Sequence, residues 1–151
     1  MENINYLEIP QISISYSLKQ KSKRVVVRSS TDAVNVFRIV FDSFIDHHEE
    51  FYVLYLSRMN RVLGVMSIGK GGISECPFDV KIIMQGALKS HASGLILCHN
   101  HPSGSLDPSI QDDFMTRKVK DAGKILDIQV NDHIILTDES YYSYADEDRI
   151  H

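Results

Sequence analysis

The sequence predicts an α/β domain, because patterns typical of strands and helices alternate along its 151 residues. Phe51 to Leu56 is a β-branched and aromatic run, and residues 77–91 carry apolar side chains at helical spacing. Gly94 to Cys98 is a short apolar run typical of a strand buried on both faces. A strand, a helix and a strand in this order imply a right-handed crossover. The length is that of one domain, so residues 1–151 are expected to form a single unit.

The first part of the chain, about residues 1–46, is expected to contain two edge strands and a helix. Apolar and polar residues alternate over 12–16, and a second apolar run covers 25–27. Charged side chains between and around these runs are typical of edge strands, where they prevent pairing with another chain. The charged residues are Lys19, Lys21, Lys23, Arg24 and Arg28. Ser29 to Asp32 is a helix-start signal, and the apolar spacing after it predicts an amphipathic helix over roughly 31–46.

The rest of the chain, about residues 49–144, is expected to hold the core with the functional site. The spacing of apolar residues indicates each helix or strand there, and turn residues or helix caps indicate where it ends. The expected elements are an antiparallel hairpin over 51–56 and 62–68, a helix from Pro77 to about His91, the strand over 94–98, a helix capped by Asp107 and Pro108 that runs to about Gly123, apolar stretches over 125–130 and 133–137 broken at Asn131-Asp132, and a packed aromatic tail over 141–144.

The composition argues against several classes of protein. Lys and Arg total 16 and Asp and Glu total 20, a net charge of −4, so nucleic-acid binding would have to be local. Apolar runs stop far short of the ~20 residues that a membrane span needs, and the N-terminus is not a basic leader. Cys76 and Cys98 form no CxxC pair and are expected to be small core residues. We therefore expect a cytoplasmic protein with no membrane partner.

Four residues between positions 99 and 112 carry the chemistry. His99 and His101 stand two apart at the end of a predicted strand, so both imidazoles point to the same side. The following loop reverses the chain into a helix, which returns Ser109 and Asp112 toward the histidines on one helix face. Two histidines and an aspartate, with a fourth position left for water, are typical of a catalytic zinc site.

The spacing of these residues, H-x-H, seven residues, S, two residues, D, matches the signature of the JAB/MPN (JAMM) metalloproteases. The neighbouring residues resemble the RadC branch of that family, and the resemblance extends from about Glu49 to Tyr144. It is carried by His99-Asn100-His101-Pro102-Ser103-Gly104, Pro108-Ser109, Asp112 and Asp132-His133-Ile134-Ile135. It implies a mixed, curved sheet flanked by helices, similar to cytidine deaminases in architecture, and a Zn²⁺ ion held by His99, His101 and Asp112.

The resemblance also implies a catalytic glutamate upstream of the metal ligands. The family places it before an aromatic-rich strand, where the register favours Glu49 and leaves Glu50 as the substitute. Many relatives carry glycine where Tyr52 stands, a departure that predicts a narrower pocket. Ser109 would steady the bound water and the oxyanion without ligating the metal, although a serine at this place is also typical of a helix cap.

These assignments predict zinc-dependent hydrolysis of an amide bond in a peptide or isopeptide. An extended substrate is expected in a groove between residues 69–74 and 102–107. A non-enzymatic, DNA-associated role in repair is the alternative hypothesis, since RadC-like proteins have long carried a DNA-repair label. The sequence makes no prediction of oligomeric state.

The other candidate residues have simpler interpretations. His47, His48, His91 and His151 have no partner spacing and are expected at the surface. Asp132-His133 is expected to be a buried structural hydrogen bond rather than part of the wall near the metal. The letters HNH at 99–101 do not define an HNH nuclease, and Cys76-Pro77 reverses the order found in zinc deaminases.

Overall fold

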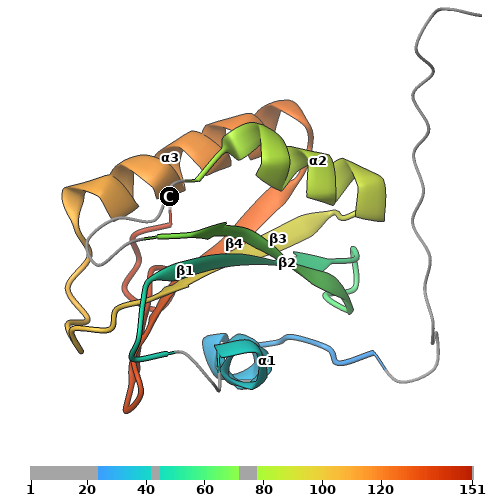
Figure 1. The fold of residues 1–151 in the computed structure, drawn as a ribbon. Coiled ribbons are helices and arrows are strands. Elements are labelled where there is room, and N and C mark those ends of the chain that lie inside the picture. The colour runs from blue at the N-terminus through green and yellow to red at the C-terminus, as the bar shows by residue number, and fades with distance from the viewer. Residues whose placement is uncertain (1–23, 42–44, 72–77, 151) are drawn as a thin grey trace, which may run out of the picture.

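The computed structural model describes residues 24–41, 45–71 and 78–150 as a mixed sheet flanked by helices, which confirms the predicted fold class (Figure 1). The strand order is β2-β1-β3-β4-β5, and β3 and β4 are its parallel neighbours. The elements are α1 (Ser30–Phe41), β1 (Glu50–Leu56), β2 (Val62–Lys70), α2 (Val80–Ser90), β3 (Gly94–Asn100), α3 (Ile110–Ile125), β4 (Gln129–Leu136) and β5 (Tyr141–Ser143).

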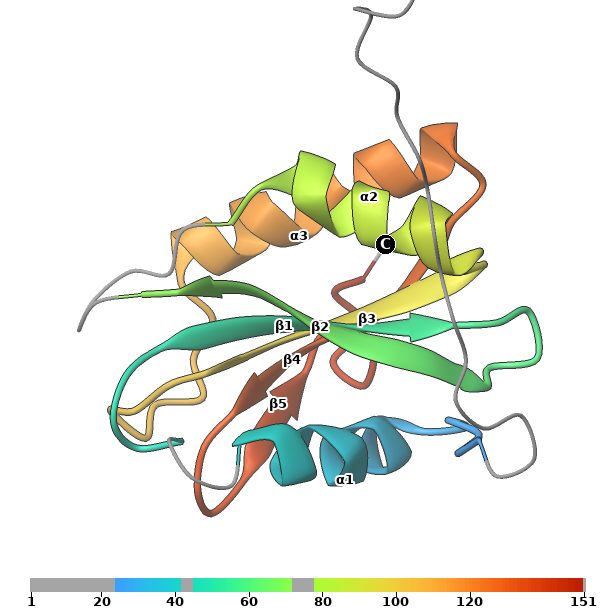
Figure 2. The same cartoon turned by 45° about the vertical axis from the view of Figure 1, so that its right-hand side comes forward.

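Helices cover both faces of the sheet. Helices α2 and α3 lie on one face and α1 lies on the other, as the two views agree (Figure 2). The alternation of strand side chains explains this arrangement, because Phe51 and Val53 of β1 pack in the core beneath α2 and α3, whereas Leu54 and Leu56 pack against α1. Cys98 is fully buried on the α1 side, as predicted, while Cys76 lies outside the described residues.

The N-terminal predictions are only partly correct. The strand expected over 12–16 lies outside the described residues, and the one over 25–27 is reduced to a single bridge between Val26 and Arg61. The helix expected to reach residue 46 ends at Phe41, and residues 45–47 form a turn. A buried side chain holds this turn, because the Asn100 amide donates hydrogen bonds to the carbonyl oxygens of residues 45 and 48, which a continuing helix would bond to its own backbone.

Two helices begin later than predicted because other side chains cap them. Helix α2 starts at Val80, after Asp79 accepts a hydrogen bond from the Lys81 backbone N–H; Pro77 lies outside the described residues. Helix α3 is capped by Ser109 rather than by Asp107. The Ser109 hydroxyl accepts from the backbone N–H of Asp112, whose carboxylate accepts from the backbone N–H of Ser109. This capping box therefore aligns two of the predicted site residues.

The two apolar stretches expected after α3 belong mainly to one strand. Residue 125 ends α3, and Asn131-Asp132 lies within β4 instead of breaking it. A bulge absorbs one residue, since Leu95 lies opposite Val130 but Ile96 lies opposite Asp132. In a regular strand, residues that stand three positions apart point to opposite sides of the sheet. Because of the bulge, residue 133 instead shares the α2–α3 side with Val130, next to His99.

The aromatic segment over 141–144 packs as predicted. Strand β5 adds to β4, and Tyr144 directly after it is buried. None of the helices in the described part of the chain combines the length and apolar character that a membrane span requires.

Candidate metal centre

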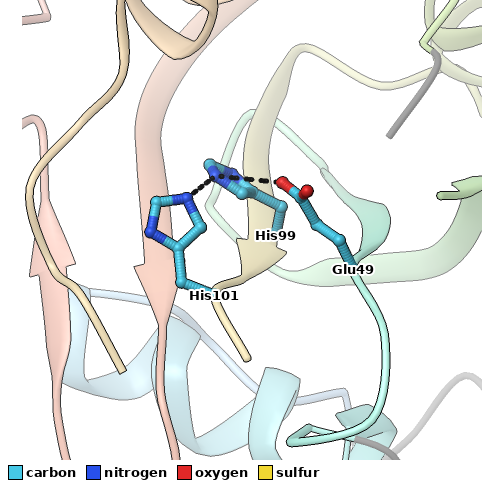
Figure 3. A group of neighbouring side chains, drawn as sticks. All are labelled: Glu49, His99 and His101. Atoms are coloured by element: carbon cyan, nitrogen blue, oxygen red, sulfur yellow. Dashed lines mark hydrogen bonds and ion pairs between the residues drawn. The ribbon is translucent and has the colours of Figure 1, made fainter. Parts of the chain in front are cut away.

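Three potential ligands meet where β3 ends and β1 begins. The two strands are antiparallel, with Phe51 opposite His99, so Glu49 enters beside the end of β3. Figure 3 shows the Glu49 carboxylate pointing toward His99, with His101 on the other side. The Nε2 atoms of His99 and His101 are 2.9 Å apart, and Glu49 Oε1 lies 3.9 Å from His99 Nε2. One ligand atom from each residue lies within 4.8 Å of the others, so the group can hold a metal ion.

Asp112 approaches the same two nitrogen atoms from helix α3. Its Oδ1 atom lies 3.1 Å from His99 Nε2, and its Oδ2 atom lies 3.8 Å from His101 Nε2. Burial by itself raises the pKa of Asp112, but contacts with His99 and hydrogen bonds from Ser109 outweigh it and hold the pKa well below its usual value. A buried carboxylate that stays ionised beside two imidazoles is suited to binding a cation.

Ser109 lies beside Asp112, where it caps the helix. Its hydroxyl donates to Asp112 Oδ2 over 2.7 Å, and the Ser109 backbone N–H donates to the same oxygen over 2.7 Å. These two bonds fix the orientation of the Asp112 carboxylate. The helix-cap interpretation is therefore correct, and a catalytic use of the Ser109 hydroxyl requires its proton to turn away from Asp112.

Glu50 faces away from the histidines. Strand alternation places it on the side of Tyr52, and its fully buried carboxylate contacts Tyr52 Oη, His48 Nε2 and Lys70 Nζ at 2.8, 2.6 and 3.1 Å. Glu49 is therefore the glutamate that reaches the candidate centre. His48 keeps a side chain that is 37% exposed, but it has a partner that its spacing did not predict, because its ring binds this buried carboxylate. His47 and His91 are exposed, as expected, and His151 lies outside the described residues.

Tyr52 does not narrow the pocket, contrary to the prediction. Its ring packs edge-on against Phe41 of α1, with the ring centroids 5.1 Å apart. The hydroxyl group binds Glu50. The tyrosine therefore belongs to the opposite face of β1 from Glu49 and His99.

Asn100 holds the segment that carries Glu49. Its side-chain oxygen accepts from the Glu50 backbone N–H over 2.8 Å. Its amide donates to the carbonyl oxygens of Ile45 and His48 over 2.7 and 2.8 Å. Sequence motifs alone predict no role for Asn100, although its place between the two histidines turns its side chain to the opposite face of β3.

Asp132 and His133 have separate roles. The Asp132 carboxylate accepts hydrogen bonds from the backbone of His133 and Ala145 and from the Ser143 hydroxyl, so the structural interpretation is correct for this residue. The Nε2 atom of His133 instead lies 2.9 Å from His99 Nδ1, the ring nitrogen that does not face His101 and Asp112. Burial lowers the pKa of His133 well below its usual value, which favours a neutral imidazole.

The hydrogen bonds of His101 fit a metal ligand. Its Nδ1 atom lies 2.8 Å from the Ser105 carbonyl oxygen, which can only accept, so Nδ1 carries a proton. In a neutral ring this leaves the Nε2 lone pair directed at His99 Nε2 and Asp112. Lone pairs and a carboxylate gathered at one point are stabilised by a cation, and two imidazoles with one carboxylate are a ligand set that zinc accepts.

A mixed sheet between helices, with histidines and carboxylates gathered at the end of its central strands, defines an α/β domain of the JAB type. The chain belongs to the RadC-like JAB domain family, whose sequence pattern matches residues 27–149. The family resemblance predicted from the sequence is thereby confirmed.

The chain is also similar to bacterial proteins that share the name UPF0758 protein. The one from Flavobacterium johnsoniae is 44% identical over 121 residues, covering 80% of this chain and 52% of the relative. The one from Porphyromonas gingivalis is 39% identical over 121 residues, covering 79% of this chain and 53% of the relative. The one from Geotalea uraniireducens is 35% identical over 117 residues, covering 77% and 51%. The chain thus spans about half the length of these relatives.

Proposed function

We propose that the chain is a zinc-dependent hydrolase that cleaves an amide bond in a peptide or isopeptide. The observation that carries the proposal is the cluster of Glu49, His99 and His101, whose ligand atoms lie within 4.8 Å of one another. Asp112 adds a carboxylate 3.1 Å from His99 Nε2 and 3.8 Å from His101 Nε2. Membership of the RadC-like JAB domain family supports a hydrolase of the JAMM type, because His99, His101, Ser109 and Asp112 stand at the spacing of the JAMM signature.

His99, His101 and Asp112 would hold the ion. The geometry also permits Glu49 as a ligand, but its carboxylate oxygen is 3.9 Å from His99 Nε2, whereas Asp112 Oδ1 is 3.1 Å away. The Asp112 carboxylate is also fixed by two hydrogen bonds from Ser109, and carboxylates that bind metals are commonly oriented by such hydrogen bonds. Glu49 is then free to carry a proton.

Bound zinc supplies Lewis acidity, which lowers the pKa of water toward ~7 and polarises the scissile carbonyl. Glu49 accepts a proton from the attacking water, whose oxygen forms a bond to the carbonyl carbon. Ser109 donates a hydrogen bond to the oxyanion that develops. The carbon–nitrogen bond then breaks, and Glu49 returns the proton to the leaving amine. The products are a carboxylic acid and an amine.

An extended substrate would lie between the two segments that border the centre. The end of β2 lies next to Glu49, since the Gly71 backbone N–H donates to the Glu49 carbonyl oxygen over 2.8 Å. On the other side, residues 102–107 follow His101. Strand β2 is at the edge of the sheet, so its backbone can pair with an added peptide strand. Residues 72–74 of the expected groove lie outside the described residues.

The test is hydrolysis of a mixed library of quenched fluorescent peptides and lysine-linked isopeptides. Activity is expected to disappear when a chelator removes the metal and to return when Zn²⁺ is added. The Glu49→Gln variant, purified in the same way, controls for a contaminating protease. Zinc-loaded protein that cleaves no member of the library, or cleavage that persists in Glu49→Gln, contradicts the proposal. Steep salt-dependent binding to duplex DNA would instead favour the DNA-associated alternative.

A further inference from the structure

A second buried imidazole lies behind His99, on the side away from the other candidate ligands. His99 Nδ1 is 2.9 Å from His133 Nε2, and His133 Nδ1 is 2.6 Å from Thr116 Oγ1. Thr116 Oγ1 in turn lies 2.6 Å from the carbonyl oxygen of Asp112. All of these side chains are buried. The contacts therefore connect helix α3 to the ring of a candidate metal ligand without passing through solvent.

The direction of each hydrogen bond follows from what each group can donate. The Asp112 carbonyl has no proton, so the one hydroxyl proton of Thr116 points at it. Thr116 Oγ1 must then accept the proton of His133 Nδ1. A neutral His133 with its proton at Nδ1 has a lone pair at Nε2, which faces His99. His99 Nδ1 therefore carries a proton and donates it to His133.

We propose that Thr116 and His133 are positioning residues that fix the Nδ1 proton of His99 and leave its Nε2 atom to bind the metal ion. The inference rests on the proposed zinc chemistry and assigns two residues to it. The assignment matters because a neutral imidazole with its proton at Nε2 would direct an N–H group at the cation. Partners that select the tautomer of a ligating histidine orient the ring and raise its basicity.

Ring packing holds the same geometry. His133 stacks on Tyr144, with the centroids 4.9 Å apart and the planes at 13°. Phe51 stacks on His99, with the centroids 6.0 Å apart and the planes at 20°. Packing alone would keep His133 in place without any effect on protons, so an experiment must separate shape from hydrogen bonding.

Thr116→Val and Thr116→Ser make that separation. Valine keeps the shape of threonine but lacks the hydroxyl, so His133 loses the acceptor that holds its proton at Nδ1. Thr116→Val is expected to lower the affinity for Zn²⁺ by about 10–100-fold, the usual effect of losing a group that supports a metal ligand. Thr116→Ser keeps the hydroxyl and is expected to retain wild-type affinity. Competition with a chromogenic chelator, using the full chain, measures both.

Nitrogen NMR of the metal-free wild-type chain gives a readout that does not depend on a variant folding. A scalar coupling is expected between His99 Nδ1 and His133 Nε2, with the shared proton bonded to His99. A proton bonded to His133 Nε2, or equal Zn²⁺ affinities of Thr116→Val and Thr116→Ser, overturns the positioning role alone. A wild-type chain that binds Zn²⁺ with the expected proton arrangement but hydrolyses nothing overturns the proposed function alone. Failure of the wild-type chain to bind Zn²⁺ overturns both.

Discussion

The side-chain oxygen of Asn100 accepts a 2.8 Å hydrogen bond from the backbone N–H of Glu50. This bond joins the end of β3 to the start of β1, so it fixes the backbone from which Glu49 reaches the candidate metal centre. Asn100 is fully buried, and its amide nitrogen also binds two carbonyl oxygens of the preceding turn. One side chain between the two histidines thus anchors the segment that carries the proposed general base.

Asn100→Asp is expected to lower the free energy of unfolding by about 2–4 kcal/mol, because two carbonyl oxygens lose their donor and face a buried carboxylate. Urea denaturation at pH 7 measures the loss. Asn35→Asp, at an exposed position on α1, is the control and should change stability by less than about 0.5 kcal/mol. An Asn100→Asp variant as stable as the control would show that this anchor is dispensable.

Glu49→Gln is expected to retain bound zinc and lose hydrolysis, because Glu49 is assigned to proton transfer. Asp112→Asn is expected to lose zinc, because an amide is a weaker ligand than the carboxylate beside the two histidines. Elemental analysis of both purified variants, with the wild type alongside, separates the two roles. Loss of zinc from Glu49→Gln with retention in Asp112→Asn would reverse the assignment.

Glu50 is expected to make stability depend on pH. Burial alone raises its pKa, but hydrogen bonds from His48, Lys70 and Tyr52 outweigh this effect and hold the pKa below its ordinary value of 4.5. Near pH 4 the unfolded chain therefore binds more protons than the folded chain. The stability from Glu50 is fully present above pH 4.5 and is lost as the pH falls through the lowered pKa of the folded state.

The corresponding measurement is urea denaturation of the wild type and Glu50→Gln at pH 7 and at acidic pH. The stability advantage of the wild type should shrink as the solution is acidified. Glu139→Gln, at an exposed site, measures the effect of removing a charge alone. An advantage that is unchanged across this range would mean that the ionised form of Glu50 is not preferred in the fold.

Gly86→Ala is expected to destabilise the protein by about 1–3 kcal/mol through overpacking. A β-carbon at Gly86 would lie 2.6 Å from Tyr55 Cζ and would displace a hydroxyl that donates to the Ile83 carbonyl oxygen. Gly64→Ala is the matched control, since a β-carbon at that strand position has no neighbour within 4 Å. Thermal unfolding of both variants gives the comparison. Equal midpoints would show that α2 can move away from β1 at little cost.

The sequence by itself determined the features that depend on local period and spacing. The hairpin of β1 and β2 and the buried strand β3 follow from short runs of apolar, β-branched and aromatic residues. The shared side of His99 and His101 follows from the period-two alternation of side chains along a strand. The spacing of the histidines, Ser109 and Asp112 also identified the family. The loop between His101 and Ser109 is short, so the start of α3 returns to the end of β3.

Only the tertiary structure decided which neighbouring groups complete the centre. The bulge at Asn131 turns His133 toward His99, and the Asn100 amide ends the turn before Glu49. A bulge depends on the register of the partner strand. The turn before Glu49 depends on hydrogen bonds from the Asn100 side chain, which is about fifty residues away in the sequence. Both are settled by competition among long-range hydrogen bonds in the buried interior, where an unpaired polar group is costly, and local sequence patterns do not encode the outcome of that competition.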